Sequence, residues 1–506
     1  MPLVQAATLR FCAEGSPSGF DPSQTDSGID FQATDQMFNT LIERERGSLT
    51  PIPGLAASWS SSADGRVHTF KLRPGVQFHT TPWFKPTRNF NADDVLFTFQ
   101  RMLDPKHPFQ QAYPSIAPYM AYMGWDRHVQ QVERVDEMTV RIHLKTPDAA
   151  FLNTLASSFS SIHSAEYAAQ LLKQGRPQQI KQQPVGTGPF VFKSYQKDSV
   201  LRMTRHPAFF RREVPLVENL VFAITPDSIV RAQRLRKNEC DIGALASRND
   251  ALELAKDPNI QLARSDGLNI GYLAFNTRKP PLDKLAVRQA LELAIDKKAL
   301  VDTVFAGAGR LAAGLMPPAS WAHDASLKPS PHDPARAREL LRQAGLPALQ
   351  LQLWAMPVQR AYNPNAQLMA QMIQADWAKI GVNARIVSYE WGEYLKRVDA
   401  GEHDVAMTGW NADSEPAGTA GLLNCGANGG SFWCSKAYDE LTQKARQTAD
   451  TAQRRALYGQ AQRLVAEQLP ISVIAHGQLV VPLRKSVVDF RLDAEGNMRF
   501  DGVSLR

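Results

Sequence analysis

The chain has 506 residues, of which 43% are hydrophobic and 21% are charged. These values exclude a disordered chain, and the length exceeds what one hydrophobic core usually serves, so two or three domains or lobes are expected. The net charge is +7, but the charge is spread along the chain, and the basic group between Arg205 and Arg212 holds only three arginines. A mildly basic surface explains this charge, and no nucleic-acid partner is expected.

The elements predicted in chain order mix strands and helices. Alternating apolar and polar residues indicate strands, and apolar residues at helical spacing indicate helices. Asn91 can cap a helix whose first turn contains two aspartates. The predicted strands cover residues 8–12, 69–73, 139–144, 190–194, 220–225, 271–276, 349–354, 384–387 and 479–482. The predicted helices cover residues 31–42, the segment after Asn91, and residues 231–237, 285–294, 334–344 and 365–380.

The last third of the chain alternates strand and helix, which favours parallel βαβ units. Residues 479–482 are expected to return to the first part of the chain and pair there. The sequence has no internal repeat and no linker rich in Pro, Gly or Ser between its halves. These patterns predict two α/β lobes joined by strands that cross between them.

The first residues of the chain and its apolar runs are informative about where the protein is located. No apolar run approaches the roughly 20 residues that span a bilayer. The first residues, Met-Pro-Leu-Val-Gln-Ala-Ala, end in small side chains, as at a signal-peptide cleavage site. A processed, exported chain fits these letters, and so does a cytosolic chain without a signal.

The cysteines Cys12, Cys240, Cys425 and Cys434 form no C-x-x-C pair, so zinc ribbons and thioredoxin motifs are absent. A Gly- and Asn-rich stretch between Cys425 and Cys434 can bend enough to join them, and Cys12 would then pair with Cys240. Such bonds persist in oxidising compartments. The count is equally compatible with four buried free thiols, and both interpretations stay open at this point.

Common catalytic signatures are absent from the sequence. It has no G-x-x-x-x-G-K-S/T phosphate loop, no H-E-x-x-H zinc motif and no G-x-S-x-G nucleophile elbow. His323 and His332 are too far apart to act as a ligand pair on one helix. The absence of these motifs argues against an enzyme, with a peptidase kept as an alternative, and neither a metal nor a cofactor is expected.

Several stretches, taken together, carry a family resemblance. The strongest are Leu-Trp-Ala-Met-Pro-Val-Gln-Arg at 353–360 and Tyr-Glu-Trp-Gly-Glu-Tyr-Leu-Lys-Arg at 389–397. Others lie at 12–17, 53–56, 72–76, 91–95, 186–190, 268–273, 287–291 and 372–377. In this order the chain resembles the dipeptide-binding proteins of bacterial ABC permeases, within the peptide/nickel substrate-binding family, over nearly its whole length.

The resemblance implies a bilobed α/β periplasmic-binding-protein fold of the cluster C type, which closes on its ligand by a hinge. The first lobe would cover residues 1–265, with an extra subdomain at about 35–185, and the second lobe residues 266–478. Residues 479–506 would return to the first lobe. The resemblance also implies two disulfides, Cys12–Cys240 and Cys425–Cys434.

The resemblance further implies a role in transport. The protein would be a periplasmic monomer, freed of its signal peptide, that captures di- and tripeptides. It would deliver them to an inner-membrane ABC permease with ATPase subunits.

The implied site must neutralise both ends of a zwitterionic peptide, because burying either charge unpaired is costly. By resemblance, Asp413 takes the ammonium group, and Arg360 takes the carboxylate with two parallel hydrogen bonds. The other residues expected at the ligand are Gly409, Trp410, Tyr362 and Trp391, together with Ser27, Gly28 and Ile29, whose backbone would pair with the peptide as an added strand. The alternatives are core packing for the aromatic residues, a plain turn at 27–29, and a surface ion pair or solvated charges for Asp413 and Arg360.

One departure from the family pattern concerns the segment after Asp413. Residues 414–423 read Ser-Glu-Pro-Ala-Gly-Thr-Ala-Gly-Leu-Leu, with Ala and Gly where the family has a bulky aromatic pair. This change predicts a wider pocket that admits tripeptides or a modified peptide. Heme, nickel and glutathione-like ligands remain alternatives within the wider family, although the sequence offers no convergent histidine site for nickel.

Overall fold

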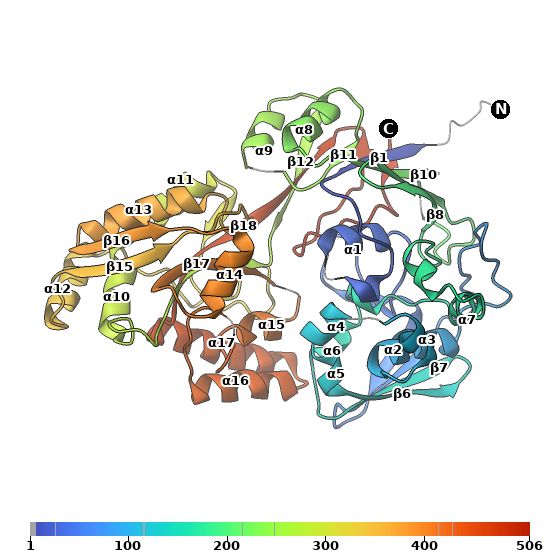
Figure 1. Cartoon of the computed structure of the whole chain (residues 1–506), viewed down its shortest axis with the longest axis horizontal. Helices are drawn as coiled ribbons and strands as arrows, with labels where there is room; N and C mark the ends of the chain where they lie inside the picture. The colour runs from blue at the N-terminus through green and yellow to red at the C-terminus, as the bar shows by residue number, and fades with distance from the viewer. Residues whose placement is uncertain are drawn as a thin grey trace. The chain divides into compact units, whose positions relative to one another are not determined.

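The computed structural model of this chain describes residues 7–25, 27–114, 117–214, 216–246, 248–412, 414–427 and 429–506. The chain divides into two compact units (Figure 1). Unit 1 consists of Met1–Ala263, Val480–Asp493 and Asn497–Arg506, and unit 2 consists of Arg264–Leu479 and Ala494–Gly496. The chain therefore passes from one unit to the other at four points.

The strands of unit 1 are β1 (Thr8–Ala13), β2 (Ile42–Arg44), β3 (Pro51–Pro53), β4 (Ala56–Ser61), β5 (Val67–Leu72), β6 (Val129–Asp136), β7 (Thr139–Leu144), β8 (Phe190–Gln196), β9 (Val200–Arg205), β10 (Asn219–Ile224), β11 (Ile242–Gly243), β19 (Val487–Val488) and β20 (Ser504–Leu505). One sheet has the order β4-β5-β7-β6 with antiparallel neighbours. A second has the order β11-β1-β10-β9-β8, in which β1 runs parallel to β10 and β11.

The helices of unit 1 are α1 (Gly28–Thr34), α2 (Ala92–Leu103), α3 (Pro108–Ala112), α4 (Pro118–Tyr122), α5 (Trp125–His128), α6 (Phe151–Thr154), α7 (Ala165–Lys173), α8 (Ser228–Arg236) and α9 (Arg248–Leu254), with 3-10 turns η1 (Pro22–Gln24), η2 (Ser158–Ser160) and η3 (Pro177–Lys181). A buried apolar cluster draws its residues from Leu41 to Val185. This cluster supports a subdomain over about 35–185, which stays a prediction.

Local sequence signals predict the start of α2 correctly, whereas the helix predicted over 31–42 is present only as far as Thr34. Asn91 caps α2, accepting from the Asp93 N–H at 3.0 Å, and the Asp94 carboxylate accepts from the Asn91 N–H at 3.0 Å. Helix α1 instead ends at Thr34. The carbonyls of Gln36 and Met37 accept from Phe190 and Gly188, so tertiary hydrogen bonds replace the helical ones there.

The strands of unit 2 are β13 (Asn269–Phe275), β14 (Gly309–Leu311), β15 (Leu349–Trp354), β16 (Val382–Val387) and β17 (Val405–Asn411), with parts of β12 (Ile260–Asp266) and β18 (Ile471–Arg484), which continue into unit 1. The order is β16-β15-β17-β13-β18. Strands β15 and β16 are parallel, as the alternation of strands and helices in the last third of the chain predicted. Strand β13, however, is antiparallel to β17 and β18.

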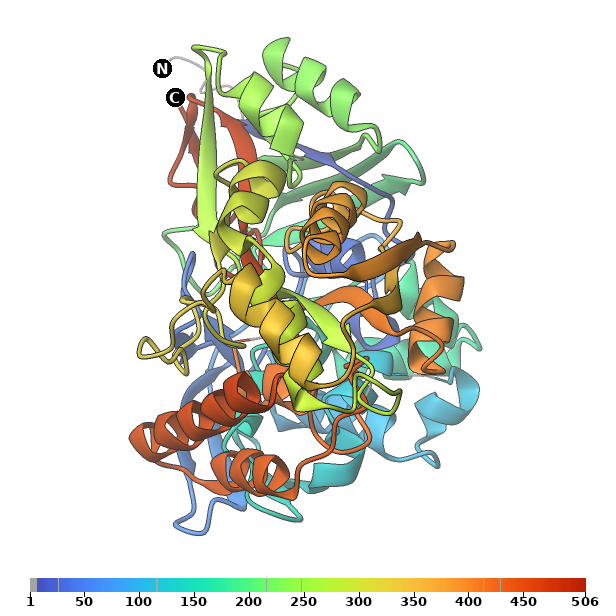
Figure 2. The same ribbon diagram turned by 90° about the vertical axis from the view of Figure 1, so that its left-hand side faces the viewer.

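The helices of unit 2 are α10 (Leu285–Ala294), α11 (Lys297–Phe305), α12 (Pro334–Gln343), α13 (Ala366–Ala378), α14 (Trp391–Asp399), α15 (Pro416–Gly421), α16 (Lys436–Gln447) and α17 (Thr451–Gln468). Alternate residues of β13 belong to different clusters. Leu273 and Phe275 pack with α10–α14, whereas Ile270 and Tyr272 pack with α15–α17. Figure 2 shows α16 and α17 side by side as the two red helices.

Both disulfides expected from the resemblance are present. Cys12 of β1 is bonded to Cys240, and Cys425 is bonded to Cys434. Each bond joins residues of a single unit. None of the helices in the described ranges is both long and apolar enough to cross a membrane.

The buried His403 makes the stability of the fold depend on pH. Burial lowers the pKa of His403 to about 4, while the Gly430 carbonyl, 2.8 Å from its ring, opposes the shift. In the unfolded chain a histidine titrates near pH 6.5, so the unfolded state binds more protons between about pH 6.5 and 4. The contribution of His403 is complete above pH 6.5 and is lost as the pH falls; it amounts to about 3 kcal/mol.

We expect His403→Gln to flatten the decline in the free energy of unfolding between pH 6.5 and 4.5. Urea unfolding at several pH values measures this slope. His332→Gln, at an exposed position, is the control and should leave the slope unchanged. A slope equal to that of the wild type in His403→Gln would contradict the assignment.

Candidate functional site

A short loop of unit 2, between β15 and α13, carries Arg360 and Tyr362. Arg360 and Asn363 exchange two backbone hydrogen bonds, both 3.0 Å long, which close the loop into a tight turn. Asn365 then caps α13 by accepting from the Leu368 N–H at 3.0 Å. The loop is therefore held at both ends by its own backbone and by the helix cap.

Three glycines from neighbouring strands form a glycine seat beneath this loop, made of Gly271 of β13, Gly409 of β17 and Gly477 of β18. Gly271 and Gly409 are directly paired. A Cβ atom at Gly271 would lie 2.2 Å from the Tyr362 carbonyl oxygen, and one at Gly409 2.3 Å from its ring. At Gly477 it would lie 2.0 Å from the Ala361 carbonyl oxygen. Only glycine allows the loop to approach the sheet so closely.

The side chains of Arg360, Tyr362 and Trp391 come together on this face of the sheet. The Arg360 guanidinium lies 5.5 Å from the centre of the Trp391 ring, within reach of a cation–π interaction. Arg360 is exposed, whereas Tyr362 is only 6% exposed. Burial raises the pKa of the Tyr362 hydroxyl, and the neighbouring Arg360 charge opposes that shift.

The buried Tyr394 fixes the aromatic part of this group. Its ring stacks on Trp391 with centroids 5.7 Å apart, and its hydroxyl donates to the Met407 carbonyl at 2.7 Å. Trp391 is the first residue of α14, which Glu390 caps by accepting from the Gly392 N–H. The aromatic surface under Arg360 is thus anchored to β17 and to a helix start.

Trp410 does not join this group. It follows Gly409 in β17 and pairs with Ile270, so its side chain points to the opposite face of the sheet. There it packs, half-buried, against the cluster that includes Tyr438 and Tyr458. Of the residues predicted around Arg360, the structure brings Tyr362, Trp391 and Gly409 together and places Trp410 apart.

Asp413, the predicted ammonium ligand, lies outside the described residues. The residue before it is fixed by a hydrogen bond from the Ala412 N–H to the Leu268 carbonyl at 2.6 Å. After it, the Ser414 N–H donates to Glu495 at 2.6 Å, and Glu415 forms a buried ion pair with Arg454 of α17. The chain is therefore anchored on both sides of position 413.

The prediction for Ser27, Gly28 and Ile29 of unit 1 requires a correction. Gly28 and Ile29 form the first turn of α1, and only Ser27 has an extended backbone. The Phe31 N–H already donates to the Ser27 carbonyl, so that carbonyl takes part in the helix. Gly28 and Ile29, as part of a helical turn, cannot add a strand to a peptide, and pairing at the extended Ser27 stays a prediction.

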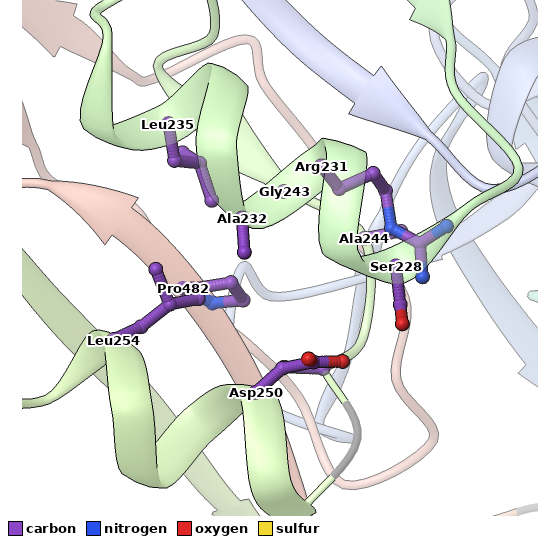
Figure 3. A pocket seen from close by; sticks show the side chains of 10 residues that line it. Ser228, Arg231, Ala232, Leu235, Gly243, Ala244, Asp250, Leu254 and Pro482 are labelled. Atoms are coloured by element: carbon purple, nitrogen blue, oxygen red, sulfur yellow. The ribbon is translucent and has the colours of Figure 1, made fainter.

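A separate small pocket lies in unit 1, between α8 and α9. Figure 3 shows Leu235, Leu254 and Pro482 on one side of it and Arg231 on the other. Arg231 donates to the carbonyls of Thr225 and Pro226, so its charge is already engaged. None of the predicted ligand residues lines this pocket.

Metal-ligating side chains do not converge in the described part of the chain. Within those ranges no group of three or more His, Cys, Asp or Glu residues is placed to hold a metal ion. Sequence reasoning missed Gly271, Gly477 and the buried Asn269 beside them. A glycine inside a strand is a signal of close backbone approach, but the partner of that approach cannot be read from the sequence.

We expect Gly409→Ala to lower the free energy of unfolding by about 1–3 kcal/mol, because its methyl group collides with the buried Tyr362 ring. Urea unfolding measures the loss. Gly421→Ala is the matched control, since nothing lies within 4 Å of a Cβ atom there. It should be neutral or stabilise by about 0.4–1 kcal/mol. Equal effects of the two substitutions would contradict the close approach.

Comparison with known proteins connects this geometry to a family. The family model of bacterial extracellular solute-binding proteins, family 5, matches residues 50–431. Di/tripeptide-binding protein 1 of Pseudomonas aeruginosa is 51% identical over 100% of this chain and 95% of its own length. Heme-binding protein A of Haemophilus influenzae is 40% identical over 98% of this chain and 92% of its own length.

Two solved structures resemble the whole chain. HbpA2 from Haemophilus parasuis has a TM-score of 0.94 at 39% identity and covers 99% of this chain and 100% of its own. A dipeptide-binding protein from Pseudoalteromonas in complex with Met-Leu has a TM-score of 0.82 at 37% identity, with coverage of 99% and 100%. The fold is that of the bilobed solute-binding proteins, and the chain belongs to the bacterial extracellular solute-binding proteins of family 5.

Proposed function

We propose that this protein binds peptides of two or three residues by their charged ends and delivers them to an ABC importer in the inner membrane. The observation that carries the proposal is that the Arg360 side chain is exposed and forms no ion pair with a carboxylate among the described residues. Its guanidinium lies over Trp391 and donates to the Gln359 carbonyl. A positioned guanidinium without a counter-ion is suited to a ligand carboxylate.

The relatives support a peptide as the source of that carboxylate. The relative from Pseudomonas aeruginosa carries the name di/tripeptide-binding protein, and the Pseudoalteromonas structure contains Met-Leu. In this chain Asp413 would take the peptide ammonium group and Arg360 the carboxylate. A fixed separation of the two would select peptide length, while water fills the space around variable side chains.

The segment 414–423 supports the inclusion of tripeptides. Helix α15 begins at Pro416, and its side chains are small, with Ala417 and Gly418 partly exposed. The buried Glu415–Arg454 pair holds its start against α17. Small side chains next to position 413 leave more room than an aromatic pair would.

The proposal includes the place where the protein works. Family members are extracellular, and disulfides persist in oxidising compartments, which supports a periplasmic protein released from its signal peptide. The protein would act as a monomer, release each peptide chemically unchanged, and meet the permease and its ATPase subunits at the membrane.

We expect Arg360→Gln and Asp413→Asn each to weaken the binding of a free dipeptide by about 10- to 150-fold, because each removes a charged contact worth about 1.5–3 kcal/mol. Calorimetric titration of ligand-stripped protein with di-, tri- and tetrapeptides measures this. Peptides with an amidated C-terminus should bind weakly to the wild type, and Arg360→Gln should not weaken their binding further. Peptides with an acetylated N-terminus should also bind weakly to the wild type, and Asp413→Asn should not weaken their binding further.

The matched control for these variants is Arg385→Gln, which removes another exposed arginine of unit 2, on β16. It should bind free dipeptides like the wild type. Tight binding of free and end-blocked peptides alike would refute end recognition, and failure of every peptide to bind would refute the peptide ligand.

Heme is the second candidate, because Heme-binding protein A is 40% identical over 98% of this chain. Two histidines of unit 2, His403 and His476, are only 0% and 5% exposed, so their rings are closed to a heme iron. We therefore expect no red-shifted hemin absorbance that a dipeptide displaces. Hemin titration with and without dipeptide tests this, and a competed shift would favour heme.

A further inference from the structure

A buried asparagine holds the strand on which the Arg360 loop rests. Asn269, the first residue of β13, is 2% exposed. Its side-chain amide donates to the Gly477 carbonyl at 2.9 Å, and its side-chain oxygen accepts from the Gly477 N–H at 2.7 Å. One side chain therefore satisfies both backbone groups of Gly477.

This arrangement completes a strand pairing that the backbone leaves unfinished. Strands β13 and β18 pair in register from Ala274 to Gly271, with an irregularity at Gly271, which lies opposite Ala475. Continuing the antiparallel register would place residue 269 opposite residue 477. There the Asn269 side chain takes the role that a main-chain amide usually has, while its own carbonyl accepts from the His476 ring at 2.7 Å.

Gly477 in turn supports the loop that carries Arg360. Its Cα lies so close to the loop that a Cβ atom would be 2.0 Å from the Ala361 carbonyl oxygen and 3.0 Å from the Tyr362 nitrogen. Packing this tight transmits small displacements to the neighbouring chain. A shift of Gly477 therefore moves Ala361 and Tyr362, the two central residues of the turn that Arg360 and Asn363 close.

The segment just before Asn269 is bonded to Ala412, the residue that precedes the other predicted ligand residue in the sequence. The Leu268 carbonyl accepts from the Ala412 N–H at 2.6 Å, and the Leu268 N–H donates to the Ala494 carbonyl at 2.7 Å. Ala412 immediately precedes Asp413 in the sequence. Leu268 and Asn269 thus connect the support of Arg360 with the residue beside Asp413.

We propose that Asn269 is a positioning residue that sets the place of Arg360 through Gly477, and thereby how the peptide carboxylate is held. This inference rests on the proposed function. Asn269 does not itself need to touch the ligand, because it acts on the glycine under the Arg360 loop.

The experiment compares the Kd of a free dipeptide with that of its C-terminal amide by calorimetric titration. The ratio of the two values reports how well the carboxylate is recognised and is insensitive to a general loss of folded protein. In Asn269→Ala we expect the ratio to fall about tenfold or more, as one of the two parallel hydrogen bonds to the carboxylate is lost. Asn269→Asp, which keeps the acceptor for the Gly477 N–H but sets a buried carboxylate oxygen against the Gly477 carbonyl, should lower the ratio at least as much.

The matched control is Asn276→Ala, at the residue after the other end of β13. Asn276 is also 2% exposed, and its side chain donates to the carbonyls of Gly401 and His403. It should lose comparable stability without changing the ratio. A ratio in Asn269→Ala and Asn269→Asp equal to that in Asn276→Ala would overturn the inference while leaving the proposed function intact. A wild-type protein that does not discriminate between free and amidated peptides would instead overturn the proposed function.

Discussion

The close contact between the Ala361–Tyr362 backbone and the glycine seat is the constraint on which the candidate site depends. Three strands present hydrogen atoms where any other residue would present a methyl group. The contact buries Tyr362, whereas Arg360 in the same turn stays exposed. A charged side chain is thus carried by a backbone that has little freedom to move.

Unlike Arg360, several charged side chains are buried and paired with an opposite charge. In unit 1, Arg101 donates two hydrogen bonds to Asp21, at 2.6 and 3.1 Å, and both side chains are almost fully buried. Burial alone would raise the pKa of Asp21, but Arg101 and His163 outweigh it and lower that pKa. In unit 2, Lys297 and Glu292 form a similar buried pair. Removing one partner of such a pair leaves an uncompensated charge, so these pairs belong to the framework, in contrast with Arg360.

Much of the fold follows from local sequence patterns. The boundaries of β7, β15 and α10 agree with the alternation and the helical spacing of their residues, and the Asn91 cap is present as predicted. Helix α1 was misplaced because residues near Met37 bond to the distant Gly188, a competition that no local pattern reveals. The conformation of such segments is determined by hydrogen bonds to residues far away in the sequence.

The site was less predictable than the fold. The resemblance identified Arg360, Tyr362 and Trp391, which the structure brings together. Gly409 and Trp410 were assigned to the same ligand, although neighbouring residues of a strand point to opposite faces, and this rule alone would have separated them. Asn269 gave no signal, because its importance comes from a partner about two hundred residues away, at Gly477.

The order of the disulfides has a consequence for how the chain is made. Cys12 pairs with Cys240 and Cys425 with Cys434, so each bond joins cysteines that are consecutive in the sequence. If oxidation follows export from the N-terminus, the first two thiols to emerge are already native partners, and so are the next two. An oxidase that joins thiols in order of appearance therefore produces the correct bonds, and the protein should mature without a disulfide isomerase.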